Sequence, residues 1–234
     1  MTEEYINVTR NAETASALIE IDESDAQNRI IVISGANEKV GRECVYAAEW
    51  DFADCDAVLT QLETTVEAVI AAKELAKKYS KPFILNPAPC IELPTELFEG
   101  VDYITPNETE AEGFTGIRVD TQEDCRRAAE KFLSLGVKNV IITLGVRGVY
   151  FTDGKTELTV PALKVKAVET TGAGDAFNGG FATAIAEGYP VETALKFATC
   201  TSALSVTRLG SSESMPYRHE ILSLLEKEFG IKLD

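Results

Sequence analysis

The sequence predicts an α/β fold whose central sheet is mostly parallel. Short apolar segments alternate with segments of helical periodicity between residues 57 and 143, which is typical of β-α-β units. Further helices are expected near the C-terminal end, and hydrophobic residues make up 45% of the 234-residue chain, enough for a sizeable core. Because no repeat or linker divides the sequence, we expect a single domain over residues 1–234.

Individual elements follow from local patterns. Residues 17–34 predict a hairpin, because the apolar segments 17–21 and 29–34 flank a polar turn at Asp22-Glu23-Ser24-Asp25. Thr121 with Asp124 three residues later resembles a capping box at the start of a helix. Strands are predicted at 57–62, 82–85, 102–105, 139–143, 148–152 and 157–160, and helices at 64–79, 107–114, 121–135, 174–187, 191–207 and 217–228.

Composition excludes several classes of function. The net charge of −16 would repel nucleic acid and anionic membranes, so neither is expected as a partner. There is no apolar run long enough to span a membrane and no signal-peptide pattern. Five cysteines without metal-binding spacing indicate reduced thiols in the cytoplasm. His219 is the only histidine, which argues against histidine-based catalysis.

The most informative segment is Gly172-Ala173-Gly174-Asp175, which leads into an apolar helix. A turn with almost no side chains at a helix N-terminus points backbone N–H groups at one place, where an anion can bind. Asp175 beside such a place would repel the anion unless it serves as a base for an attacking nucleophile. The alternative is that the segment is an ordinary tight turn, followed by an acid that stabilises the helix dipole.

Several ordered segments stand out along the chain. They are Asn28-Arg-Ile-Ile-Val-Ile-Ser-Gly-Ala-Asn37, Gln61-Leu-Glu63, Asn86-Pro-Ala-Pro89, Asn107-x-x-Glu110, Thr143-Leu-Gly-Val-Arg-Gly148, Glu169-Thr-Thr-Gly-Ala-Gly-Asp175 and Val206-Thr-Arg-Leu-Gly210. These segments resemble motifs of the ribokinase-like (PfkB) carbohydrate kinases, and within that family those of the ribokinases. The resemblance covers nearly the whole chain and implies a three-layer α/β/α sandwich with a reduced β lid at 17–34 and a catalytic core at 57–234.

The resemblance also implies roles in phosphoryl transfer from ATP to a sugar hydroxyl. Asp175 would be the base, and the N–H groups of Gly172, Ala173 and Gly174 would stabilise the transferred phosphoryl group. The remaining implied ligands are Glu63 for the sugar, Asn86 for the phosphates, Asn107 and Glu110 for Mg²⁺, and Thr143, Gly145, Gly148 and Thr199 for the nucleotide. Without the resemblance, Asn107 reads as a helix cap, Glu110 as a solvated acid, Asn86 as a turn residue, and 143–148 as a plain turn.

A monovalent cation site, for K⁺ by preference, is implied as well. Its carboxylate would be Glu169, where the family usually has aspartate. Oxygens near Thr171, Ser205, Arg208, Gly210 and Ser214 would complete it. Because glutamate is one methylene longer, we expect weaker or altered activation by K⁺.

Two family features have no counterpart in this sequence. They are a first strand with a substrate-binding aspartate and a Gly-Gly-Lys-Gly-Ala-Asn motif that holds the sugar. We therefore expect an N-terminally shortened kinase with D-ribose as its first substrate candidate, while deoxyribose, fructose, tagatose 6-phosphate and nucleosides stay open. The alternative is a homologue that binds nucleotide without catalysis. With a reduced lid, the homodimer of the family is also in doubt.

Overall fold

The computed structural model describes residues 5–21 and 28–233. A six-stranded sheet has the order β3-β4-β5-β6-β7-β8. Its strands are β3 (Val58–Thr60), β4 (Phe83–Leu85), β5 (Tyr103–Ile104), β6 (Asn139–Thr143), β7 (Val149–Thr152) and β8 (Glu157–Val160). The first four strands run parallel, and β7 and β8 are added antiparallel at the end. The prediction of a mostly parallel sheet is confirmed.

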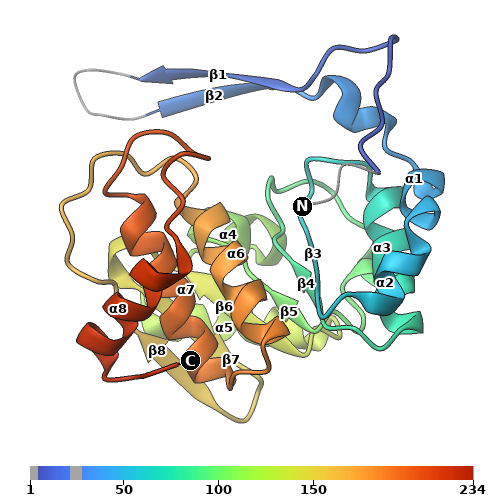
Figure 1. The fold of residues 1–234 in the computed structure, drawn as a ribbon. Coiled ribbons are helices and arrows are strands. Elements are labelled where there is room, and N and C mark those ends of the chain that lie inside the picture. Colours follow the sequence, from blue (N-terminus) through green and yellow to red (C-terminus); the bar gives the residue numbers. More distant parts are fainter. Residues whose placement is uncertain (1–4, 22–27, 234) are drawn as a thin grey trace.

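Helices cover both faces of this sheet, which gives the expected three layers (Figure 1). Side chains alternate between the faces, so Phe83 and Leu85 belong to one core and Ile84 to the other. The first core includes α3 (Val66–Lys78), α4 (Glu108–Thr115) and α5 (Gln122–Ser134). The second includes α6 (Ala173–Ala186), α7 (Val191–Ser205) and α8 (Arg218–Phe229).

Side-chain caps fix where the helices of the first face begin. Thr65 accepts a hydrogen bond from the N–H of Ala68 at the start of α3. Asn107 and Thr121 form complete capping boxes at the starts of α4 and α5. Each box satisfies two N–H groups that a helix end would otherwise leave without a partner. The cap that the sequence predicts at Thr121 is therefore confirmed.

The N-terminal segment stands apart from the sheet. Strands β1 (Ser16–Ile21) and β2 (Asn28–Ile33) pair antiparallel, with Ser16 opposite Ile33, as the hairpin prediction requires. The predicted turn at 22–25 lies outside the described residues. In Figure 1 the hairpin extends as an arm above the body of the protein. A two-stranded ribbon cannot bury both of its faces, and Leu18, Ile31 and Ile33 are each more than half exposed.

Two helices between the hairpin and the sheet were not predicted. They are α1 (Arg42–Ala47) and α2 (Glu49–Asp54), and each is only six residues long, too short to show helical periodicity in the sequence. Tertiary contacts help to hold them: the carboxylate of Glu74 on α3 accepts from Arg42 and from the hydroxyl of Tyr46. Among the described residues, none of the helices is long and apolar enough to cross a membrane.

Two adjacent glycines in α6 predict opposite effects on stability. A methyl group on Gly180 would lie 2.6 Å from Oγ1 of Thr201 and 3.1 Å from Cα of Ala198, because α6 and α7 pack closely there. One on Gly179 would contact nothing within 4 Å. Gly180→Ala should lower the free energy of unfolding by about 1–3 kcal/mol through overpacking. Gly179→Ala should raise it by about 0.5–1 kcal/mol through helix propensity.

Urea unfolding of both variants and the parent chain measures this pair of effects. Equal shifts of the two variants in the same direction would contradict the close packing of α6 on α7.

Candidate active site

A cavity of about 650 Å³ opens at the carboxyl edge of the sheet, between the loop after β6, the segment after β8, and helices α6 and α7. Its lining includes the four residues that the resemblance suggested for the nucleotide, Thr143, Gly145, Gly148 and Thr199, together with Asn107, which it suggested for Mg²⁺. Ligands of open parallel sheets bind at this edge, so the cavity lies where the fold places binding sites.

The predicted anion-binding turn forms the start of α6. Gly172 is the residue before the helix, with φ +78°, a conformation that glycine adopts without strain. The N–H of Ala173 donates to the carbonyl of Thr170 at 3.1 Å, so it is already used within the turn. The N–H groups of Gly174 and Asp175 have no acceptor among the described residues. Gly174 lines the cavity, and a side chain there would meet nothing within 4 Å.

Asp175 lies in the first turn of α6 and is exposed. No hydrogen bond or ion pair joins its carboxylate to another described residue. Partial burial among neighbouring atoms raises the pKa of Asp175 above its ordinary value. A carboxylate that is free of internal partners and less stable as an anion is chemically suited to accept a proton from a bound hydroxyl group.

Asn107 and Glu110 are joined by the capping box of α4. The N–H and the side-chain amide of Asn107 each donate to a Glu110 carboxylate oxygen, both at 2.9 Å. Burial raises the pKa of Glu110, while the two hydrogen bonds from Asn107 oppose the shift. The interpretation of Asn107 as a helix cap is thus confirmed. Glu110 is half-buried rather than fully solvated.

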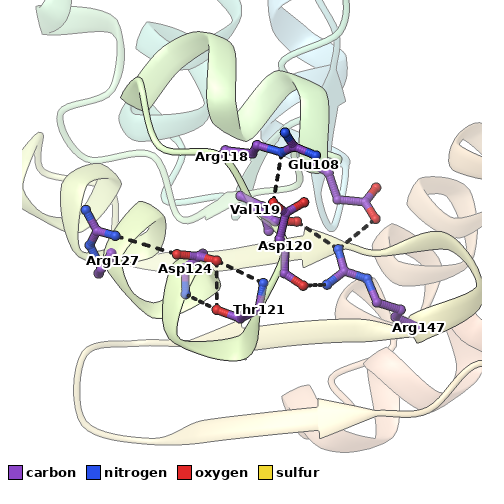
Figure 2. A network of polar contacts seen from close by, with 8 residues as sticks. All are labelled: Glu108, Arg118, Val119, Asp120, Thr121, Asp124, Arg127 and Arg147. Atoms are coloured by element: carbon purple, nitrogen blue, oxygen red, sulfur yellow. Dashed lines mark hydrogen bonds and ion pairs between the residues drawn. The ribbon is translucent and has the colours of Figure 1, made fainter.

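The loop after β6 is held from outside the cavity by Arg147 (Figure 2). Its guanidinium donates to the carbonyls of Asp120 at 2.6 Å and Val119 at 2.8 Å, and to Oε1 of Glu108 at 3.1 Å. These contacts connect the loop to the segment between α4 and α5. Arg147 was not selected from the sequence, because its partners are mostly carbonyl oxygens that only the folded chain brings near.

A buried polar chain links the turn of α6 to two strand ends. Asn86, after β4, donates through Nδ2 to the carbonyl of Thr105 at 3.1 Å. The Thr105 hydroxyl donates to Oδ1 of Asn178 at 2.6 Å, and Nδ2 of Asn178 donates to the carbonyl of Gly174 at 3.0 Å. Thr105 and Asn178 were also absent from the sequence-based selection, since neither belongs to a motif.

The residues suggested for a monovalent cation come from two neighbouring segments. The N–H groups of Val168 and Glu169 donate to the carbonyl of Val206, at 2.7 and 3.2 Å. The Glu169 carboxylate accepts from the N–H of Gly210 at 2.9 Å. This bond, and the hydroxyl of Thr171, lower the pKa of Glu169. The segments that hold Glu169 and Gly210 therefore lie side by side.

The other suggested cation ligands already have partners within the protein. The carbonyl of Ser205 accepts from the N–H of Arg208 at 3.1 Å, and the Ser214 hydroxyl donates to the carbonyl of Ser211 at 3.0 Å. The side chain of Arg208 forms an ion pair with Glu220. Ser205 and Ser214 are almost completely buried. Among the described residues, no group of three or more histidine, cysteine, aspartate or glutamate side chains could hold a metal ion.

Glu63, the residue suggested for the sugar, is exposed in the loop after β3. Its N–H donates to Oε1 of Gln61 at 2.7 Å. No contact between described residues joins Glu63 to Asp175. Glu63 follows β3 and Asp175 lies in the first turn of α6, so both are at the carboxyl edge of the sheet.

Comparison with known proteins identifies the family. A match to the pfkB family carbohydrate kinases covers residues 2–218. The chain belongs to this family.

Several relatives of this family member are ribokinases. It is 39% identical to a ribokinase of Haemophilus influenzae over 222 residues, which are 95% of this chain and 72% of that protein. It is also 39% identical to a deoxyribokinase of Salmonella typhi, over 87% of this chain and 68% of that one. The crystal structure of a Thermotoga maritima ribokinase matches with a TM-score of 0.81 and 41% identity, over 92% of this chain and 70% of that one.

A structure of Arabidopsis thaliana ribokinase complexed with ribose and ATP matches with a TM-score of 0.86 and 34% identity, again over 92% of this chain and 70% of that one. These likenesses confirm the ribokinase-like fold that the motifs indicated.

Substitution of either of two glycines in the loop after β6 by alanine should lower the stability of the protein by different amounts. Gly145 and Gly148 both have positive φ, +52° and +95°. A methyl group on Gly148 would lie 2.1 Å from the carbonyl oxygen of Val160, whereas one on Gly145 would contact nothing within 4 Å. Gly145→Ala should cost about 1–2 kcal/mol of stability from backbone strain. Gly148→Ala should cost more, because the steric overlap adds about 1–3 kcal/mol.

Thermal unfolding and ADP titration separate the two roles. Gly145→Ala should stay folded and bind ADP more weakly, because its new methyl group occupies the cavity. Unchanged ADP binding by a folded Gly145→Ala variant would contradict the placement of a nucleotide against this loop.

Proposed function

We propose that this chain catalyses ATP-dependent phosphorylation of a sugar primary hydroxyl, with D-ribose as the first substrate and deoxyribose as the second. The observation that carries the proposal is Asp175, a carboxylate without internal partners beside the unpaired N–H groups at the start of α6. Support for the substrates comes from relatives named ribokinase and deoxyribokinase at 39% identity.

In the proposed reaction the sugar hydroxyl attacks the γ-phosphorus of ATP. Asp175 accepts the hydroxyl proton as the new O–P bond forms, and the bond from the γ-phosphorus to the β,γ-bridging oxygen breaks, releasing ADP. The N–H groups of Gly174 and Asp175, with that of Gly172, would donate to the equatorial oxygens of the transferred group. Ala173 would contribute through its small size, since its N–H is used by Thr170.

The nucleotide would occupy the 650 Å³ cavity, with Thr143, Gly145, Gly148 and Thr199 along its wall and Asn86 near the phosphates. Glu63 would contact the sugar. Lys164 is the only lysine or arginine that lines the cavity in the described part of the chain, so local N–H donors carry most of the phosphate binding in this acidic protein.

Mg²⁺ would be held by Glu110 and Asn107 together with the phosphates of ATP. The site fits this cation because Mg²⁺ retains several waters and commonly uses one carboxylate plus substrate phosphates. Bound there, Mg²⁺ would neutralise charge on the phosphates.

The five cysteines are all free thiols, which agrees with a reducing, cytoplasmic environment. A homodimer would use the exposed apolar side chains of the β1–β2 hairpin.

Asp175→Asn tests the base directly. The amide cannot accept the proton, so ribose-dependent release of ADP should fall by a factor of roughly 100 or more. Titration with ADP should show binding within about twofold of the parent chain, because the cavity is unchanged. The measurement is a coupled ADP-release assay with a sugar panel of ribose, deoxyribose and fructose.

Glu187→Gln is a matched control on the same helix, since Glu187 lies at the opposite end of α6 and pairs with Arg218. It should leave ADP release unchanged. An Asp175→Asn variant with parental activity would refute the role of Asp175, and a parent chain that binds ADP yet phosphorylates no sugar would refute the proposed function.

The monovalent cation should have a weaker or altered effect here. The site would consist of the Glu169 carboxylate, the Ser214 hydroxyl and carbonyl oxygens near Thr171, Ser205, Arg208 and Gly210. The carboxylate fits a cation because it is held ionised by the N–H of Gly210, and bound K⁺ would stabilise the segment before the turn of α6. We expect activity in K⁺ to exceed that in Na⁺ or without added salt by only a small factor. Rates that are identical in all three conditions would contradict a cation site.

A further inference from the structure

We infer that Thr105 and Asn178 are a buried positioning pair that holds the anion-binding turn of α6 and Asp175 against the carboxyl edge of the sheet. The inference rests on the proposed function and deepens it. Neither residue would contact the reacting atoms, so their effect on catalysis would pass through Gly174 and Asp175.

The hydrogen bonds of the pair run from the edge of the sheet to the first turn of α6. Thr105 follows β5 directly, and its hydroxyl donates to Oδ1 of Asn178 at 2.6 Å. A hydroxyl has one proton to donate, and the carbonyl of Leu85, at 3.5 Å, is a much poorer acceptor. Asn178 then donates through Nδ2 to the carbonyl of Gly174 at 3.0 Å. The sheet edge is thereby connected to the residue that precedes Asp175.

The same connection includes the loop after β4. Asn86 donates its side-chain amide to the backbone carbonyl of Thr105 at 3.1 Å. Residues of two neighbouring strand ends and the first turn of α6 are thus fixed relative to one another by three hydrogen bonds. These are the places where the phosphates and the base are proposed to lie, so a shift of one would move the others.

Because both side chains are buried, their hydrogen bonds favour one position of α6 on the sheet. Thr105 is 1% exposed and Asn178 is 5% exposed. A buried hydroxyl or amide is costly unless it is hydrogen-bonded, so these two groups favour one arrangement of α6 on the sheet over others that apolar contacts would permit. Phe177 and Phe181 already hold α6 in the core through apolar contacts. The hydrogen bonds of the pair therefore determine where α6 lies on the sheet rather than whether it packs there.

The alternative is that the pair contributes only to stability, as any buried hydrogen bond does. Thr152 supplies a matched control. It is also buried, 4% exposed, and its hydroxyl accepts from the N–H of Gly154 in the β7–β8 turn, away from the cavity lining. Thr→Val at either position keeps the side-chain shape and removes one hydrogen-bonding hydroxyl.

The experiment compares Thr105→Val, Thr105→Ser and Thr152→Val with the parent chain. Thr105→Val should reduce kcat for ribose by about 10- to 100-fold, since small misplacement of a catalytic group has effects of that order. The KM for ATP should change little. Amide hydrogen exchange in peptides spanning residues 173–180 should accelerate in Thr105→Val alone. Thr105→Ser should restore most of kcat and the slow exchange, and Thr152→Val should match the parent in both.

Asn178→Ala provides a second route if Thr105→Val folds poorly. It should reproduce the loss of kcat, and the double variant with Thr105→Val should be no worse than the more severe single variant, because both remove the same connection. The inference is overturned if Thr105→Val and Asn178→Ala change stability while kcat and exchange across 173–180 remain those of Thr152→Val. If the parent chain phosphorylates no sugar, the proposed function fails, and the exchange measurement still decides whether the pair positions the turn.

Discussion

Helix α6 begins at the carboxyl edge of the sheet, and most of the candidate site depends on the position of its first turn. Gly172 adopts a left-handed conformation that turns the chain into the helix. The turn leaves N–H groups without internal acceptors next to the cavity. The helix dipole adds positive potential at the same place. These features can bind an anion only if the helix end is held at a fixed distance from the strand ends.

Local donors matter because the protein as a whole is acidic. A net charge of −16 gives no long-range attraction for phosphate, and the cavity lining among the described residues has a single basic side chain. Phosphate binding therefore depends on nearby backbone N–H groups, on small residues that let the phosphates approach, and on the loop after β6, which Arg147 holds through hydrogen bonds outside the cavity. Asp175 can remain beside an anion because its charge is removed when it accepts a proton, and partial burial already makes that protonation easier.

The sequence predicted most elements because their signals are local. Short apolar segments located the strands, and side-chain caps such as Thr121 located helix starts. Helices α1 and α2 were missed because six residues do not establish a period, and their contacts come from α3. In the site, the motif residues Gly174 and Thr143 line the cavity, and their roles toward a ligand stay predictions. Thr105 and Asn178 were not, since a threonine at a strand end and an asparagine inside a helix have no distinctive local pattern.

The sequence by itself determined the family, the parallel sheet and the kinds of groups at its carboxyl edge, because these depend on periodicity and on motifs read in order. Only the tertiary structure decided which distant groups meet. The guanidinium of Arg147 donates to the carbonyls of Val119 and Asp120, and the hydroxyl of Thr105 donates to Asn178, 73 residues away in the chain. It also decided that Glu169 reaches Gly210, 41 residues away in the chain. Hydrogen bonds between distant segments depend on distances and angles of a fraction of an ångström, and residue order alone does not specify these.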